Sequence, residues 1–179
     1  EYALKVVAEI ASRGIQVKLV LTGPPDPHDA QNMAYYQSLR QVRQELGIEN
    51  QMRFVFESGP DPEQPYQIDS RVVGDLFRIS DLLFMPSHRE GFGMPVLEAG
   101  LAGIPIIASE IPAAVEIAAN EVLLIQPDQN PEITIVQIVD LVKRNPISRF
   151  RRQVRLNYTW EAIFKKEIEP LLHQGSHSC

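Results

Sequence analysis

The stretch PSHREGFGMPVLEAG, residues 86–100, is the most informative part of this 179-residue chain for its fold. An apolar run, Leu82–Met85, precedes it, and Pro86 ends that run. Two glycines follow, and a segment with helical spacing begins at Met94, with Pro95 suited to the first helical turn. A buried strand, a glycine-containing loop and a helix in this order predict one unit of a parallel sheet.

The same alternation of strand and helix extends in both directions along the chain. Five short apolar strands are predicted, at Ile15–Leu21, Met52–Phe56, Leu82–Met85, Ile104–Ala108 and Val122–Ile125. Helices are predicted at Tyr2–Ser12, Asp29–Leu46, Val72–Ile79, Met94–Leu101, Ala113–Ala119, Pro131–Lys143, after Pro146, and from Thr159 to Leu172. The pattern predicts an α/β fold, a Rossmann-like parallel sheet with helices on both faces. The polar residues 173–179 are predicted to form a disordered tail.

Composition and charge exclude several classes of protein. The chain has 17 Lys and Arg against 23 Asp and Glu, and a net charge of −6 disfavours nucleic-acid binding. Its single cysteine, Cys179, can form no intrachain disulfide, which suits a reducing compartment, and we expect a cytoplasmic location. No apolar run approaches the roughly 18 residues of a membrane span.

The chain opens within a predicted helix, and no signal peptide pattern precedes that helix. We therefore expect a part of a longer polypeptide. Whether that polypeptide associates with a membrane is left open by these residues.

Loops at the carboxyl ends of parallel strands are where such sheets bind ligands. Here they are Thr22–Asp29, Glu57–Ser70, Pro86–Gly93 and Ser109–Ala114. In the third loop, glycines let the backbone approach a ligand closely, and the free amides of the following helix suit a phosphate group.

Two glutamates, Glu90 and Glu98, flank this anion site. Carboxylates repel phosphate, but they accept charge-assisted hydrogen bonds from hydroxyls. A ligand with hydroxyls on both sides of a diphosphate meets both demands. Nucleotide sugars have this chemistry.

The segment resembles the donor-binding motif of the retaining glycosyltransferases of family four, which have the GT-B fold. That motif is Glu, seven residues, Glu, with Gly-aromatic-Gly after the first Glu, and Glu90 to Glu98 match it. The similarity extends from Gly14 to Leu172. It implies that residues 1–172 form the nucleotide-sugar (donor) binding domain, the C-terminal half of a GT-B fold, and that the N-terminal acceptor domain of the same polypeptide lies outside this chain.

The resemblance also implies roles for individual residues. Glu90 is the candidate catalytic residue and would hold hydroxyls of the donor sugar at the reacting centre. The amides of Gly91, Phe92 and Gly93 would contact sugar and diphosphate, and Glu98 would bind the ribose hydroxyls. The loop after Phe56 would border the base. The other candidate donor-binding residues are Thr22, Gly23, His88 and Arg89. No metal or other cofactor is expected, because the family stabilises the departing diphosphate with protein groups.

Each of these features also has a structural interpretation. Glu98 could complement its helix dipole, Phe92 could anchor the core, and the two loop glycines could be ordinary turn residues. His88 and Arg89 could be solvated surface residues.

Two further functions stay open for the whole chain. One is a non-catalytic nucleotide-sugar-binding domain, and the other is an epimerase or phosphorylase of the same fold. As a transferase, the isolated domain is expected to be inactive, because it would hold half of an active site.

Overall fold

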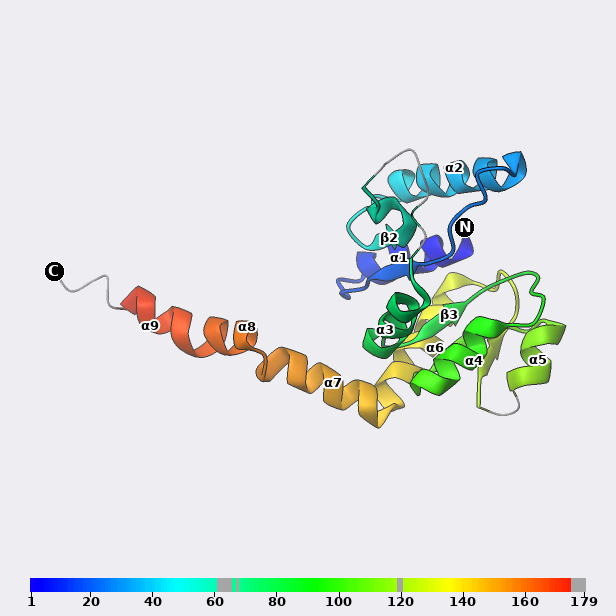
Figure 1. Cartoon of the computed structure of the whole chain (residues 1–179). Helices are drawn as coiled ribbons and strands as arrows, with labels where there is room; N and C mark the ends of the chain where they lie inside the picture. Colours follow the sequence, from blue (N-terminus) through cyan, green and yellow to red (C-terminus); the bar gives the residue numbers. More distant parts are fainter. Residues whose placement is uncertain (61–65, 67, 119–120, 175–179) are drawn as a thin grey trace. The chain divides into compact units, whose positions relative to one another are not determined.

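The computed structural model describes residues 1–60, 66, 68–118 and 121–174. Parallel strands and helices alternate along the chain, as predicted (Figure 1). The strands are β1 (Leu19–Leu21), β2 (Met52–Phe54), β3 (Leu83–Met85), β4 (Ile106–Ser109) and β5 (Leu123–Ile125). The helices are α1 (Tyr2–Ser12), α2 (Ala30–Glu45), α3 (Ser70–Ile79), α4 (Met94–Ala102), α5 (Pro112–Ala118), α6 (Pro131–Arg144), α7 (Pro146–Asn157), α8 (Trp160–Ile163) and α9 (Glu169–Gln174), with a 3-10 segment η1 (Val55–Ser58) and a π-helical segment η2 (Phe164–Ile168). The α/β class is confirmed.

The chain divides into two units, Glu1–Ile138 and Val139–Cys179. The first unit holds β1 to β5 and the candidate site, and the second holds helices α7, α8 and α9. Helix α9 extends to Gln174, so it includes the first two residues of the predicted tail. The rest of that tail, residues 175–179, lies outside the described residues.

The five strands form two sheets, which corrects the prediction of one. β1 pairs with β2, and β3, β4 and β5 pair in that order, all in parallel. An apolar pattern predicts a strand but not its neighbours. In a doubly wound sheet of order 3-2-1-4-5-6, the first strand separates the pair 3-2 from the group 4-5-6. The observed groups match these two sets, and the described residues hold no strand between them.

β1 and β3 each present one backbone edge that is not paired with another described strand. Leu19 donates its N–H on the side of β2, and Leu83 donates its N–H on the side of β4. Because N–H groups alternate in direction along a strand, those of Val20 and Phe84 point the other way. Val20 is also exposed, whereas all four residues of β4, which is paired on both sides, are buried.

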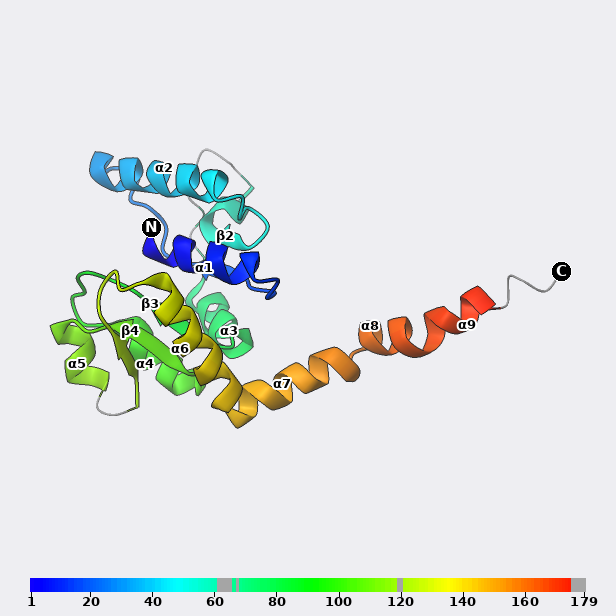
Figure 2. The same ribbon diagram turned by 180° about the vertical axis from the view of Figure 1, so that it is seen from behind.

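Helix α1 packs on elements of both sheets. Its Leu4 and Val7 lie in the apolar cluster of β1 and β2, while the Tyr2 ring lies 6.2 Å from the ring of Phe84 in β3. The Tyr2 hydroxyl is also 2.6 Å from the hydroxyl of Thr134 in α6. Helices α1 and α6 lie on the same side of β3, as both views show (Figures 1 and 2).

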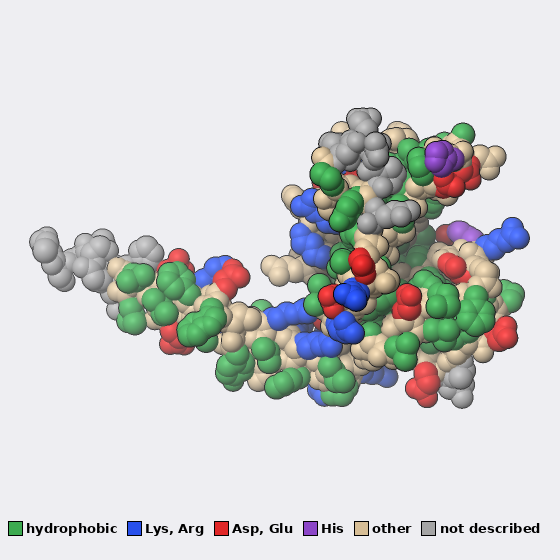
Figure 3. Space-filling model, viewed as in Figure 1, with side chains coloured by type: hydrophobic (Ala, Val, Ile, Leu, Met, Phe, Trp, Pro, Cys, Tyr) green, Lys and Arg blue, Asp and Glu red, His purple; other side chains and the backbone are tan. Residues whose placement is uncertain are grey.

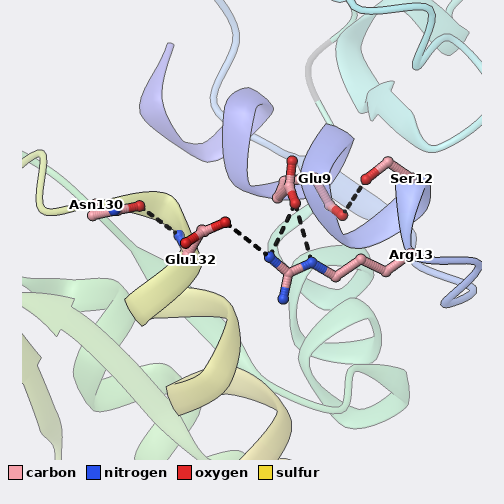
Figure 4. A network of polar contacts seen from close by, with 5 residues as sticks. All are labelled: Glu9, Ser12, Arg13, Asn130 and Glu132. Atoms are coloured by element: carbon pink, nitrogen blue, oxygen red, sulfur yellow. Dashed lines mark hydrogen bonds and ion pairs between the residues drawn. The ribbon is translucent and has the colours of Figure 1, made fainter.

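A polar network adds to this contact between α1 and α6 (Figure 4). Arg13, which directly follows α1, binds Glu9 of α1 at 3.0 Å and lies 3.6 Å from Glu132 of α6. Asn130 accepts a hydrogen bond from the N–H of Glu132 at 2.9 Å. Asn130 therefore caps the start of α6, as asparagine often does at a helix N-terminus.

The exposed surface carries apolar side chains over α4 and α5 (Figure 3). Leu101 is 91% exposed, and Met94, Leu97 and Val115 are exposed as well. Among the described residues, no helix combines the length and the apolar character that a membrane span requires.

Hydrogen exchange of backbone amides tests the two-sheet arrangement. We expect the amides of Val20 and Phe84 to exchange at least about fivefold faster than those of Leu21 and Met85, because only the latter donate to a neighbouring strand, and a hydrogen bond contributes about 1 kcal/mol. Residue-resolved exchange measured by NMR gives the four rates. Equal protection within each strand would contradict free edges at β1 and β3.

Candidate functional site

The loop Pro86–Gly93 joins β3 to the first turn of α4, and Gly93 is the residue on which this turn depends. Gly93 has φ +76°, which is unfavourable for residues with a side chain. It is buried, and a Cβ atom at this position would lie 3.3 Å from Cδ1 of Ile117 in α5. Both the backbone conformation and the space therefore favour glycine.

Helix α4 begins without a side-chain cap, since its capping residue is Gly93. The N–H of Val96 donates to the carbonyl of Gly93 at 2.9 Å, and Pro95 has no N–H. The other N–H groups at this helix end have no intrahelical acceptor. Their partial positive charge suits an anion such as phosphate.

Glu90 is half-buried and is held by a neighbour within the loop. The hydroxyl of Ser87 donates to its Oε1 at 2.6 Å. Glu98 is exposed on α4 and forms no ion pair with a described residue. The structure thus places one fixed carboxylate before the helix end and one open carboxylate beyond its first turn.

His88 and Arg89 are both exposed in the same loop. His88 Nε2 lies 3.2 Å from Oδ2 of Asp128, in the loop that follows β5. Asp128 has φ +53°, a conformation that aspartate tolerates better than most residues. Sequence reasoning missed Asp128, and its position directly after a strand end was the signal available.

The remaining predicted residues fall into two groups. Phe92 is 63% exposed, so the interpretation as a core anchor is wrong and its ring is open to a ligand. Thr22 and Gly23 follow β1 directly. The loops after β1 and β3 leave their strands toward the same side (Figures 1 and 2), but the strands belong to different sheets.

Phe56 is buried, in contrast to Phe92. Its ring packs against those of Tyr36 and Phe54, with centroids 5.2 Å from each. The next residue, Glu57, accepts a hydrogen bond from the Tyr36 hydroxyl at 2.7 Å and pairs with Arg43 at 2.9 Å. Phe56 therefore anchors the start of the loop that was predicted to border the base, and its ring is not free to contact a ligand.

The same cluster shifts two acid–base equilibria. Burial raises the pKa of Tyr36, and its hydrogen bond to Glu57 raises it further, to about 12. Burial also raises the pKa of Glu57, but the hydrogen bonds from Arg43 and Tyr36 outweigh burial, so the pKa of Glu57 is lowered. Glu57 therefore contributes stability above its ordinary pKa and loses that contribution as pH falls.

No group of three or more His, Cys, Asp or Glu side chains is placed to hold a metal ion in the part of the chain that the structure describes. The chemistry that the site offers is a helix end for an anion, with carboxylates on either side for hydroxyls.

Comparison with known families gives one match that covers most of the chain. The family described as "Glycosyl transferases group 1" matches residues 1–157. Among curated proteins, a D-inositol 3-phosphate glycosyltransferase of Rhodococcus erythropolis is 31% identical over 110 residues, which cover 60% of this chain and 22% of that protein.

Solved structures show the same fold at lower identity. The C-terminal domain of a glycosyl transferase group 1 family protein from Francisella tularensis matches with a TM-score of 0.63 and 19% identity, over 92% of this chain and 77% of that one. An Anabaena protein solved in complex with UDP matches with a TM-score of 0.56 and 19% identity, over 95% of this chain and 44% of that one. This chain spans between 22% and 40% of the length of the curated relatives.

Replacement of the two loop glycines tests the backbone account of the site. We expect Gly93→Ala to lower the free energy of unfolding by about 1–2 kcal/mol, because alanine resists a positive φ. The matched control is Gly91→Ala. Gly91 has no positive φ, and a Cβ there would meet nothing within 4 Å. Urea unfolding of both variants gives the comparison, and equal losses would contradict a special role for Gly93.

Proposed function

Because this chain belongs to the glycosyl transferases group 1 family, we propose that it binds the nucleotide diphosphate sugar from which its longer polypeptide transfers a sugar to an acceptor hydroxyl. One observation carries the proposal. The uncapped start of α4 lies between Glu90, which Ser87 fixes, and Glu98, which is exposed. The arrangement suits one ligand that has an anionic centre and hydroxyl groups at both ends.

The backbone N–H groups and the two glutamates would bind different parts of the ligand. The N–H groups of the loop and of the α4 start would bind the diphosphate, since the helix end carries partial positive charge. Glu98 would accept hydrogen bonds from the ribose hydroxyls, and Glu90 from hydroxyls of the sugar that is transferred. Because carboxylates repel phosphate, each would bind only its own part of the donor.

Transfer would proceed with retention of the anomeric configuration, as the resemblance to the family implies. Charge grows on the diphosphate as the bond to the sugar breaks, and preoriented N–H groups would stabilise that charge. Glu90 would keep the sugar in position for the acceptor hydroxyl. The acceptor would be bound by parts of the polypeptide beyond these residues, so this chain alone would bind donor without transferring it.

Calorimetric titration tests the donor site. We expect this chain to bind one of UDP, GDP and ADP, and Glu98→Ala to weaken that binding by about tenfold to a hundredfold, the effect of losing hydrogen bonds to a charged group. UDP is the first candidate, because the Anabaena structure contains it.

The matched control is Glu121→Ala, an exposed glutamate that precedes β5 and so lies away from the carboxyl ends of the strands. Its affinity should equal that of the unmodified chain. If no nucleoside diphosphate or its sugar derivative binds at millimolar concentration, the proposed function is wrong. An equal loss in both variants would remove Glu98 from the site.

A further inference from the structure

Ser87 makes the one side-chain hydrogen bond that Glu90 receives within the described part of the chain. Its hydroxyl donates to Glu90 Oε1 at 2.6 Å, and both residues are half-buried. A short bond from a hydroxyl to a carboxylate is of the strong, charge-assisted kind. Such a bond restricts the rotamers of a glutamate that otherwise has three rotatable side-chain bonds.

The local chain explains why the two side chains meet. Pro86 follows β3 directly and fixes its own φ at the strand end. Ser87 and Glu90 are only three residues apart, so the short loop segment between them brings the hydroxyl to the carboxylate. Gly91 follows, and it leaves the backbone free to continue toward Gly93.

Only one of the two carboxylate oxygens of Glu90 takes part in this bond. The bond from Ser87 occupies Oε1, and no described residue forms a hydrogen bond or ion pair with Oε2. One carboxylate oxygen is therefore fixed by the protein, while the other stays available as an acceptor. A carboxylate that is held in this way loses less conformational freedom when a hydroxyl binds to it.

We propose that Ser87 is a positioning residue, which holds the Glu90 carboxylate so that Oε2 receives a hydroxyl of the donor sugar. This inference rests on the proposed function, and it adds a residue that acts through Glu90 and does not touch the ligand. This role predicts different effects on two kinds of ligand. Replacing Ser87 should weaken binding of the nucleotide sugar and leave binding of the nucleoside diphosphate unchanged, because only the sugar would contact Glu90.

The test compares UDP-glucose with UDP, GDP-mannose with GDP, and ADP-glucose with ADP, by calorimetry on this chain. For the pair that binds, Ser87→Ala should weaken binding of the sugar derivative by about twofold to tenfold, the effect of freeing one side chain. Binding of the nucleoside diphosphate should not change. Ser87→Thr, which keeps the hydroxyl, should restore the affinity.

Two controls separate positioning from a structural effect. In a Glu90→Ala background, which removes the acceptor, Ser87→Ala should have no further effect on affinity, since its action passes through the carboxylate. Ser12→Ala removes an exposed serine hydroxyl that donates to the carbonyl of Glu9 at 2.8 Å (Figure 4), and it should change neither affinity. The ¹³C resonance of the Glu90 carboxylate should shift in Ser87→Ala and return in Ser87→Thr without ligand.

The outcomes distinguish the two proposals. If no pair binds to the unmodified chain, the proposed function fails and the role of Ser87 fails with it. If a pair binds but Ser87→Ala weakens binding of the nucleoside diphosphate as much as binding of its sugar derivative, the positioning role alone is overturned. Additive effects of Ser87→Ala and Glu90→Ala, or an unchanged carboxylate resonance, overturn it as well.

Discussion

The left-handed backbone of Gly93 is the constraint on which the rest of the site depends. It turns the chain from the loop after β3 into α4 and leaves the helix end without a side-chain cap. Ile117 lies too close to Gly93 for a Cβ atom to fit without adjustment. The start of α4 therefore lacks a side-chain cap because the backbone and the space at Gly93 both favour glycine.

The candidate site combines a helix end that attracts anions with two carboxylates that accept from hydroxyls, and these groups do not pair with one another. The partial positive charge of the α4 start attracts anions, while Glu90 and Glu98 accept from hydroxyls. Neither glutamate is paired with a basic side chain among the described residues. His88, by contrast, is paired with Asp128 from the loop after β5. His88 is therefore directed to a carboxylate other than the two glutamates.

The sequence predicted the kind of element well and the neighbours of each strand poorly. Apolar runs are local signals, and they located the five strands, although β2 ends at Phe54 where the 3-10 segment η1 begins. β1 is shorter than predicted because pairing with β2 begins only at Leu19, opposite Met52. The division into two sheets could not be predicted, since strand order depends on contacts between distant segments.

The candidate site shows the same limit. The spacing from Glu90 to Glu98 and the intervening glycines were readable, because one loop and one helix contain them. Phe56 and Phe92 have equivalent side chains, yet the first is buried beside Tyr36 and the second is exposed. The bond from Ser87 to Glu90 needed the geometry of the loop, which composition and periodicity do not specify.

The most direct test of the account is a map of amide chemical-shift changes as the nucleoside diphosphate that binds is added to this chain. We expect the largest changes at Gly91, Phe92, Gly93 and Met94, because these N–H groups would meet the diphosphate. Changes centred on the apolar surface of α4 and α5 around Leu101, with the loop unaffected, would contradict this expectation.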